Sequence, residues 1–393
     1  MEFHFILSPS SHNETNRQRQ RYEILKVAII YNEPKNTAAE DHWLRRSDPT
    51  YKPRSHDFVD ASEYGVLLQM QSISDALHEH GHQVSIFSAD DNPRRLCSFL
   101  GAEKPDVIFN CCESILGQSK LEMNVAAMYE LFGIPYTGSP ALTLGIALEK
   151  ALAKSIFVQN DIPTPRYQVF ESDTLSGTPY NPSPPLPVGK GRVNDMRYPL
   201  IVKPVHEDAS IGIDARAIVY SEVELLDRVR FILREFEQPA LAEEFIDGRE
   251  FNVGVIGGPG DSLQTLPVSE ITFDRMPVGQ PRIVSYEAKW VEESPLYQTT
   301  VPVCPASLPS NIECQARQLA LWAANAVGLR DYGRVDLRMD SEDNLFVLEA
   351  NPNPDISEDA GFMRAARVSG RTYAGTINEI LELTIERSKN VER

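Results

Sequence analysis

Residues 333–355, with the sequence GRVDLRMDSEDNLFVLEANPNPD, predict a β-hairpin. Val335, Leu337 and Met339 alternate with polar residues, and this period of two is typical of a strand with one buried face. Residues 341–344 (SEDN) favour a tight turn, because their side chains form local hydrogen bonds with the backbone. We therefore expect an antiparallel sheet with one apolar face and one polar face.

The polar face of this hairpin indicates a cation site. A turn centred on residues 342–343 places Asp336 opposite Glu349. The same register places Arg334 opposite Asn351. Cross-strand neighbours are about 5 Å apart, so the two carboxylates repel each other unless a cation lies between them. Oxygen ligands of this kind suit Mg²⁺ that bridges to phosphates. The alternative is a surface hairpin with solvated acids, although Glu349 ends an apolar run that should be buried.

The composition excludes several classes of protein. A length of 393 residues predicts two or three domains. The net charge of −18 argues against a nucleic-acid or membrane partner. Five cysteines without CxxC spacing are typical of a reducing cytosol, which predicts a cytoplasmic protein. No apolar run has transmembrane length, and we expect residues 1–24 to be a disordered N-terminal extension.

Strands and helices alternate in the first third of the chain. The pattern predicts strands at 26–31, 83–88 and 106–110 and helices at 64–80 and 121–132. Such alternation is typical of an open parallel α/β sheet, in which ligands bind at the carboxyl ends of the strands. Glu33 follows the first strand, where no GxGxxG dinucleotide fingerprint occurs.

The remaining chain predicts a mixed arrangement. Residues 172–197 are rich in Pro, Gly and Ser and are expected to form an exposed insertion. We expect an irregular stretch at 272–300. The other expected elements are a helix at 143–159, strands at 167–170 and 200–205, a helix at 222–236, strands at 240–245 and 250–256, and helices at 312–327 and 372–388.

Lys203 lies in the middle of an apolar strand, which predicts an anionic partner. A buried lysine is costly unless it is paired. The small polar segment 206–212 that follows would suit a loop over phosphates, so Lys203 is a candidate phosphate contact. A salt bridge to a structural carboxylate is the alternative.

The stretch 243–246 (EEFI), followed by Glu250, resembles an adenosine site. A strand edge offers backbone groups to adenine, one acid accepts a hydrogen bond from its amino group, and a second acid binds the ribose hydroxyls. Solvated acids on an edge strand are the alternative.

Five elements in order carry a family resemblance: Lys150, LIVKPVHEDASIG, AEEFIDGREF, YEAKW and GRVD…LEANPNP. Together they resemble the D-alanine–D-alanine ligases and their relatives in the ATP-grasp superfamily, from about Lys26 to Leu383. The resemblance implies an ATP-grasp fold of mixed α/β and α+β class. Its parts would be an N-terminal open parallel α/β (pre-ATP-grasp) domain at 25–140, a small central domain at 141–250 and a C-terminal α+β domain at 251–393.

The resemblance also implies residue roles. Expected ATP contacts are Lys150, Lys203, Glu207, Ser210, Glu243, Glu244, Phe245, Ile246, Glu250 and Lys289. Asp336, Glu349 and Asn351 would bind metal, with two Mg²⁺ ions expected and Mn²⁺ as an alternative. Arg334, Lys289 and Ser210 would be catalytic.

The implied activity is an ATP-dependent carboxylate–amine ligase with small-molecule substrates. Transfer of the γ-phosphoryl group would convert a carboxylate into an acyl phosphate, which an amine attacks to form an amide or peptide bond, releasing ADP and phosphate. Lysines, an arginine and metal ions would stabilise the negative charge that develops. Relatives imply a homodimer through the N-terminal domain. A true D-alanine–D-alanine ligase of peptidoglycan synthesis and a catalytically silent ATP-binding scaffold are the alternatives.

Several positions depart from the family pattern and predict a different acceptor. The expected Gly-Gly-x-Ser-x-Glu stretch is missing at Glu33, and Trp290 replaces a tyrosine. After the Asn-x-x-Pro motif, Asp355 and Ala360 replace a glycine and a serine. Negative charge here should repel a carboxylate unless Arg364 or Arg367 offsets it, so we expect an acceptor other than D-alanine in its usual pose. The candidate substrate residues are Glu33, Trp290, Asp355, Glu358, Asp359 and Ala360.

Overall fold

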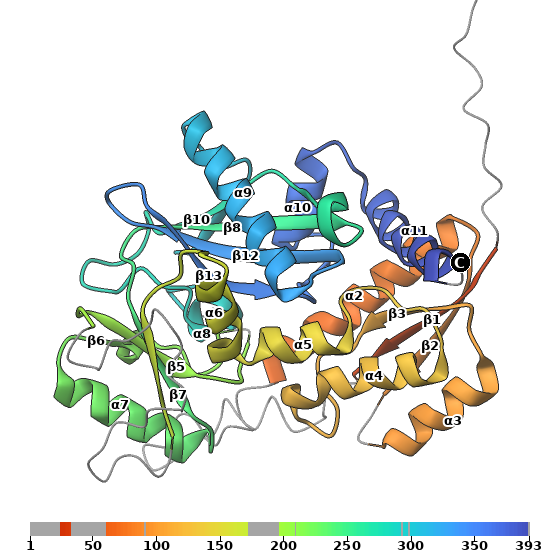
Figure 1. The fold of residues 1–393 in the computed structure, drawn as a ribbon, viewed down its shortest axis with the longest axis horizontal. Coiled ribbons are helices and arrows are strands. Elements are labelled where there is room, and N and C mark those ends of the chain that lie inside the picture. The colour runs from red at the N-terminus through yellow and green to blue at the C-terminus, as the bar shows by residue number, and fades with distance from the viewer. Residues whose placement is uncertain are drawn as a thin grey trace, which may run out of the picture.

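The protein forms three β-sheets with helices packed against them (Figure 1). The structure is a computed structural model that describes residues 24–32, 60–89, 92–171, 196–208, 210–291, 294–297 and 299–391. The expectations for the N-terminal extension, for Glu33 and for most of the 172–197 insertion therefore lie outside the described residues. None of the helices in the described ranges combines the length and hydropathy needed to cross a membrane.

The N-terminal sheet is parallel, with strand order β2-β1-β3. Its central strand is almost fully buried, as the uninterrupted apolar sequence predicts. The predicted strands and helices are confirmed with small shifts at their ends, and a helix that we did not predict, α3, begins after Asn92, whose side chain accepts from the backbone N–H of Arg94 at 3.1 Å. The elements are β1 (Lys26–Tyr31), α2 (Asp60–Glu79), β2 (Gln83–Ser88), α3 (Pro93–Glu103), β3 (Val107–Cys111) and α4 (Glu122–Phe132).

The expected single helix at 143–159 is wrong. The chain instead forms α5 (Ala141–Leu148) and α6 (Lys150–Gln159), separated by Glu149 with a non-helical ψ of 83°. The carboxylate of Glu149 pairs with the ring of His206 at this break. A tertiary contact thus accompanies a helix interruption that helix propensity alone does not reveal.

The central sheet is antiparallel, with strand order β4-β7-β5-β6. Helix α7 begins after Ser221, whose hydroxyl accepts from the backbone N–H of Glu224, and it packs its apolar stripe on one face of the sheet. The opposite face carries Lys203 and Glu243. Ile201 pairs with Glu243, and Lys203 lies two residues after Ile201 on the same strand, so the three side chains point the same way. The elements are β4 (Tyr167–Phe170), β5 (Leu200–Pro204), β6 (Ile218–Val219), α7 (Glu222–Glu235) and β7 (Ala240–Glu244).

The largest sheet has the order β11-β10-β8-β12-β13, and its paired strands are antiparallel. Helix α9 packs on the apolar face, where Ala316 and Ala320 join Val335 and Leu337 in one core. The polar face of the sheet is left for the site described below. The elements are β8 (Arg249–Gly257), β9 (Gln264–Thr265), β10 (Ser269–Thr272), α8 (Tyr286–Trp290), β11 (Val301–Val303), α9 (Ser310–Val327), β12 (Asp331–Met339), β13 (Leu345–Asn351), α10 (Gly361–Val368) and α11 (Tyr373–Val391).

The predicted register of the hairpin is confirmed up to Asp336 and is wrong from Leu337 to the tip. Arg334 pairs with Asn351 and Asp336 with Glu349, as expected. The register then shifts by one residue after Asp336, so that Met339 pairs with Leu345 across a five-residue loop, 340–344. Asp340 organises this loop, since its carboxylate accepts from two backbone N–H groups within it. A bulge in the strands therefore compensates for a turn that is one residue longer than the prediction.

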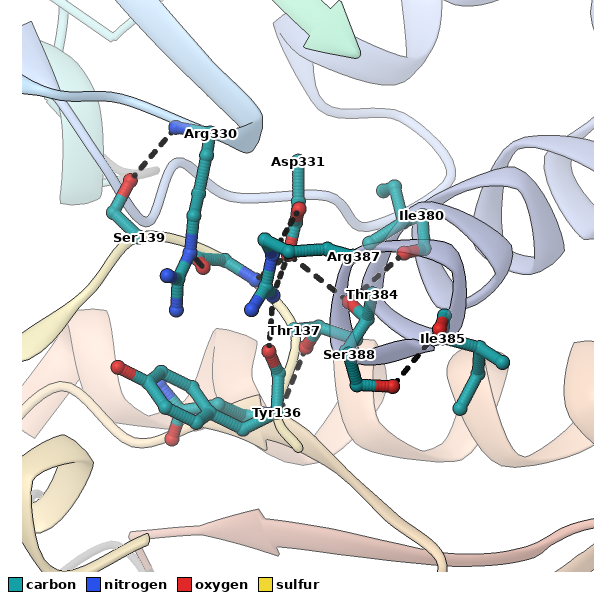
Figure 2. A network of polar contacts seen from close by, with 12 residues as sticks. Tyr136, Thr137, Ser139, Arg330, Asp331, Ile380, Thr384, Ile385, Arg387 and Ser388 are labelled. Atoms are coloured by element: carbon teal, nitrogen blue, oxygen red, sulfur yellow. Dashed lines mark hydrogen bonds and ion pairs between the residues drawn. The ribbon is translucent and has the colours of Figure 1, made fainter. Parts of the chain in front are cut away.

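The first and last parts of the chain share one hydrophobic core. Helix α11 lies beside α2 and the strands of the N-terminal sheet (Figure 1). A polar network completes this junction (Figure 2). The carboxylate of Asp331, the first residue of β12, accepts from the N–H of Gly138, from the Thr384 hydroxyl and from the Arg387 guanidinium, at 3.0, 3.0 and 2.8 Å. The boundaries at 140 and 250 remain a prediction.

Gly248 provides a stability prediction. A Cβ atom at this position would lie 1.8 Å from the carbonyl oxygen of Met339, which is backbone and cannot rotate away. Gly248→Ala should therefore lower the free energy of unfolding by about 1–3 kcal/mol, measured by urea denaturation. Gly101→Ala is the matched control, because its nearest contact is at 3.7 Å. Equal stabilities of the two variants would contradict the prediction.

Candidate active site

A cavity of about 670 Å³ lies between the three sheets. Most of the residues predicted from the sequence line it, although they come from distant parts of the chain. These are Lys203, Ser210, Glu243, Glu244, Phe245, Ile246, Glu250, Lys289, Trp290, Arg334, Asp336, Glu349, Asn351 and Asp355.

The polar face of the large sheet forms the floor of the cavity. Asp336 has Asn252 opposite it on β8 and Glu349 opposite it on β13. Arg334 pairs with both carboxylate oxygens of Asp336, at 2.7 and 2.8 Å. The Asn252 amide donates to the same carboxylate at 2.7 Å. Charge on Asp336 is thus balanced by an arginine two residues earlier on the same strand.

Glu349 lies in a strongly positive environment. Its carboxylate is 3.8 Å from the ammonium group of Lys150. Burial by itself raises the pKa of Glu349, but Lys150, Lys203, Arg334 and Lys289 together lower it to about 2. Glu349 is therefore ionised at neutral pH, as a metal ligand must be.

The oxygen atoms of Asp336, Glu349 and Asn351 suit Mg²⁺, provided that other ligands complete its coordination shell. Within the described residues, no three His, Cys, Asp or Glu side chains gather closely enough to hold a metal by themselves. Asp336 and Glu349 supply two carboxylates, and the amide oxygen of Asn351 already accepts from the backbone N–H of Asn353 at 3.0 Å. Mg²⁺ typically takes one or two carboxylates and completes its shell with waters and phosphates.

Lys203 and Glu243 form a buried triad with Lys154. The Glu243 carboxylate lies 2.6 Å from the Lys203 ammonium and 2.7 Å from that of Lys154. Burial raises the pKa of Glu243, but the two ammonium groups outweigh it and the net shift is downward. Lys203 therefore has the anionic partner that its buried position predicts. Sequence reasoning missed Lys154 as a site residue, although its position four residues after Lys150 places both on one helix face.

The loop after β5 is held by Lys150. Asp208 pairs with the Lys150 ammonium at 2.8 Å and lines the cavity, which the sequence analysis did not predict. Burial lowers the pKa of Lys150, but Asp208 and Glu349 raise it further than burial lowers it. Glu207, an expected ATP contact, instead accepts from the Gln238 amide at 2.8 Å and does not line the cavity.

Arg338 was also missed, although it occupies a polar position in the alternating hairpin strand. Its guanidinium pairs with the Glu250 carboxylate at 2.6 Å and donates to the Ile246 carbonyl oxygen at 2.9 Å. It also lies 5.0 Å from the centre of the Phe245 ring. Arg338 therefore fixes three of the residues expected at the adenosine end.

Helix α8 directs Lys289 and Trp290 toward the cavity. Ser285 caps this short helix by accepting from the N–H of Ala288 at 3.1 Å. The Lys289 ammonium lies 4.9 Å from the centre of the Trp290 ring. Desolvation and the nearby Arg334 guanidinium lower the pKa of Lys289. Ser210 connects this region to the loop after β5, because its hydroxyl donates to the Val284 carbonyl oxygen at 2.8 Å.

The segment that follows the hairpin, residues 355–364 (the tail segment), differs from its prediction. Asp355 and Arg364 line the cavity, but Glu358, Asp359 and Ala360 do not. Arg367 and Arg364 donate to the carbonyl oxygens of Glu358 and Asp359, at 2.6 and 2.7 Å, and not to their carboxylates. Ala360 is the N-cap residue, immediately before α10. These three side chains are therefore not brought to the cavity, because the chain turns into α10 there.

The N-terminal sheet contributes a wall that sequence reasoning largely missed. Gln69, Glu113 and Glu122 line the cavity. Asn32, at the carboxyl end of β1, accepts from the backbone N–H of Glu113 at 2.8 Å and so joins the ends of two strands. A signal for this wall existed, because the carboxyl ends of parallel strands form ligand sites.

Comparisons with known proteins agree with this geometry. The family model described as D-ala D-ala ligase C-terminus matches residues 156–382. The chain is 31% identical to the uncharacterized protein y4sG of Sinorhizobium fredii, over 80% of this chain and 87% of that protein. It is 30% identical to a D-alanine--D-alanine ligase of Erythrobacter litoralis, over 81% of this chain and 88% of that enzyme.

Solved structures show the same fold. The crystal structure of a D-alanine--D-alanine ligase from Bacillus anthracis, complexed with ATP, superposes with a TM-score of 0.66 and 17% identity, over 93% of this chain and 99% of that one. A second structure of the Bacillus anthracis ligase gives 0.66 and 18%. The fold is therefore the predicted ATP-grasp fold, and the chain belongs to the D-alanine–D-alanine ligase family of ATP-dependent, ADP-forming C–N ligases.

Proposed function

We propose that this enzyme uses ATP and Mg²⁺ to join a small carboxylate to an amine other than D-alanine. The observation that supports it best is that Glu349 and Asp336 line one cavity together with Lys203, Arg334 and Lys289. Lys150 does not line this cavity, but its ammonium group lies 3.8 Å from the Glu349 carboxylate. Several cations around ionised carboxylates suit a polyphosphate and its metal ion.

The nucleotide would lie between the central and large sheets. Lys150 and Lys203 would neutralise phosphate oxygens, exchanging their present carboxylate partners for the ligand. The strand end at 244–246 would offer backbone groups to adenine. Glu250, oriented by Arg338, would accept from the ribose hydroxyls.

Asp336, Glu349 and Asn351 would hold Mg²⁺, which would neutralise negative charge on the transferred phosphoryl group. Arg334 and Lys289 would stabilise charge that develops on the reacting oxygens. Ser210, anchored to the Val284 carbonyl, would keep the loop after β5 over the phosphates. No side-chain nucleophile is required, because the acyl phosphate forms on the substrate itself.

The proposal of an unusual acceptor rests on the walls of the cavity. Asp355, Glu113 and Glu122 line it, with Arg364 as the cation of the tail segment that lines the same cavity. Acidic groups favour an ammonium group and disfavour a free carboxylate.

We also propose a homodimer through the N-terminal sheet, which is supported by the exposed Leu131 (86%) at the end of α4. We propose a cytoplasmic location as well, which is supported by the free cysteines.

The test is a substrate screen with the full-length protein, ATP and Mg²⁺. D-alanine and other amino acids serve as donors, hydroxylamine serves as a trap for acyl phosphate, and amines and amino acids serve as acceptors. We expect ADP release with hydroxamate for some donors and an amide product, identified by mass, for some acceptors. If the enzyme makes D-alanyl-D-alanine as fast as it forms an amide with the best acceptor of the screen, the proposal of an acceptor other than D-alanine is contradicted. Nucleotide binding without ADP release under any condition would favour the scaffold alternative.

A further inference from the structure

Glu122 occupies the N-terminal wall of the cavity, close to the proposed metal ligands. It is the first residue of α4 and lines the cavity. Its carboxylate accepts from the side-chain amide of Asn353 at 3.3 Å. The backbone N–H of Asn353 in turn donates to the side-chain oxygen of Asn351. One residue therefore connects Glu122 with the metal end of the cavity.

The orientation of the Asn353 amide is set by a buried tyrosine. The Tyr332 hydroxyl donates to the Asn353 side-chain oxygen at 2.8 Å. The amide nitrogen must then point the other way, where it donates to the Cys112 carbonyl oxygen at 3.0 Å and to Glu122. A neutral amide therefore orients the Glu122 carboxylate without neutralising its charge.

Two other carboxylates of the cavity are held by cations, and a third is held by its own loop. Asp208 pairs with Lys150, and Asp336 pairs with Arg334. Asp355 accepts from the backbone N–H and the hydroxyl of Ser357, at 2.8 and 2.5 Å. A carboxylate that is already paired with a cation is less available to an incoming ammonium group. Glu122 differs from Asp208 and Asp336 in having a neutral amide as its partner.

Two of the groups that face Glu122 raise its pKa. Glu113 and Cys112 face it from the loop after β3, Asp208 from the loop after β5, and Tyr332 from β12. Burial raises the pKa of Glu122 well above its usual range, the charges of Glu113 and Asp208 raise it further, and the hydrogen bond from Asn353 offsets only part of this rise. An ammonium group that enters the cavity would offset these effects and be attracted to the carboxylate.

We propose that Glu122 is the general base that accepts a proton from the ammonium group of the acceptor substrate. The inference rests on the ligase function proposed above. The neutral amine nitrogen would form the C–N bond with the acyl carbon, and the C–O bond to phosphate would break with its electron pair leaving on phosphate. Of the two protons lost by the ammonium group, one resides on Glu122 and is then released to solvent. The other leaves with the phosphate.

The test compares two acceptors with wild type and Glu122→Gln, using D-alanine as the donor. Hydroxylamine is largely uncharged at neutral pH and needs no base to become nucleophilic, whereas D-alanine and the amines of the screen arrive as ammonium ions. We expect Glu122→Gln to lower kcat with the best ammonium acceptor by ~10²-fold or more, the usual contribution of a general base. Hydroxamate formation should stay within about threefold, since donor activation is untouched.

Two further variants make the test specific. Glu103→Gln carries the same chemical change at an exposed position of α3 and should match wild type with both acceptors. Asn353→Ala removes the orienting amide, so it should also lower the ratio of amide to hydroxamate product. A thermal midpoint for each variant separates this selective loss from unfolding, because an unfolded variant loses both products equally.

The outcomes distinguish this inference from the proposed function. Equal loss of both products in a folded Glu122→Gln variant, or loss of neither, would overturn the role of Glu122 while the ligase proposal stands. Hydroxamate formation by wild type with no amide from any ammonium acceptor would overturn it as well. Absence of both products and of ADP release in wild type would overturn the two proposals together.

Discussion

Glu349→Gln is expected to lower the rate of ADP release by ~10³-fold or more while the fold is retained. Glutamine keeps the shape of the side chain but removes the charge that four cationic side chains surround. It also removes one of the two carboxylates proposed to hold Mg²⁺, and metal-assisted charge stabilisation is worth several kcal/mol in phosphoryl transfer. The rate is measured at saturating ATP over a Mg²⁺ titration, with the donor and acceptor found in the screen.

Glu342→Gln is the matched control for this variant. Glu342 lies in the exposed loop at the tip of the same hairpin, away from the cavity lining. It should retain wild-type activity and wild-type Mg²⁺ dependence. Activity of Glu349→Gln within tenfold of wild type, in a folded protein, would refute the metal assignment.

The same substitution gives a pH dependence of stability. The pKa of Glu349 in the folded protein is about 2, below the ordinary value of 4.5. A group whose pKa is lowered by folding contributes stability above its unfolded pKa and loses that contribution as the pH falls through its folded pKa. The thermal midpoint of wild type, measured without metal, should therefore exceed that of Glu349→Gln most above pH 4.5. The difference should narrow toward pH 2.

Asp331→Ala is expected to lower the free energy of unfolding by about 3–5 kcal/mol, the usual result of breaking a buried ion pair. The Asp331 side chain is fully buried and accepts from three groups, the Gly138 N–H and the Thr384 and Arg387 side chains of α11, the last two of which Figure 2 shows. Its loss leaves the Arg387 guanidinium without its carboxylate. Asp331 also has a φ of 63°, a region in which alanine is strained.

Denaturation in guanidinium chloride measures this effect, and an exposed ion pair provides the comparison. Asp227 pairs with Arg230 on the surface of α7 at 3.0 Å. Asp227→Ala should change stability by less than about 1 kcal/mol, because solvent screens such pairs. Similar losses for the two variants would show that the network of Asp331 does not stabilise the junction between the first and last parts of the chain.

Local sequence patterns were sufficient to predict the strands and helices whose apolar residues form a continuous run or repeat at a regular spacing. The strand at 26–31 was predicted from an uninterrupted apolar run and the helix at 312–327 from its helical pattern, and the structure places β1 and α9 there. Periodicity did not reveal the break at Glu149 or the short helix α10. Both depend on contacts with segments distant in the sequence, such as His206 for the break.

The hairpin that begins at Gly333 shows which features follow from the sequence pattern and which follow only from the tertiary structure. Its alternating residues determined that Arg334, Asp336, Glu349 and Asn351 share one face, because the side chains of a strand alternate with a period of two. This pattern and the order of the family motifs were enough to identify an ATP-dependent ligase. The present partners of these residues depend on the fold, since Asn252 reaches Asp336 through the pairing of β8 with β12, and Lys150 reaches Glu349 from helix α6.

The side of the cavity that we propose for the acceptor depends on tertiary structure alone. Glu122 and Asn353 are 231 residues apart in the chain, and they meet because the N-terminal sheet packs against the last helix and the end of the hairpin. The sequence by itself was enough to predict which residues would bind phosphate and metal, because that prediction rests on short motifs with a fixed spacing. Which carboxylate faces the acceptor depends on long-range packing between the first and last parts of the chain, and no local pattern encodes such packing.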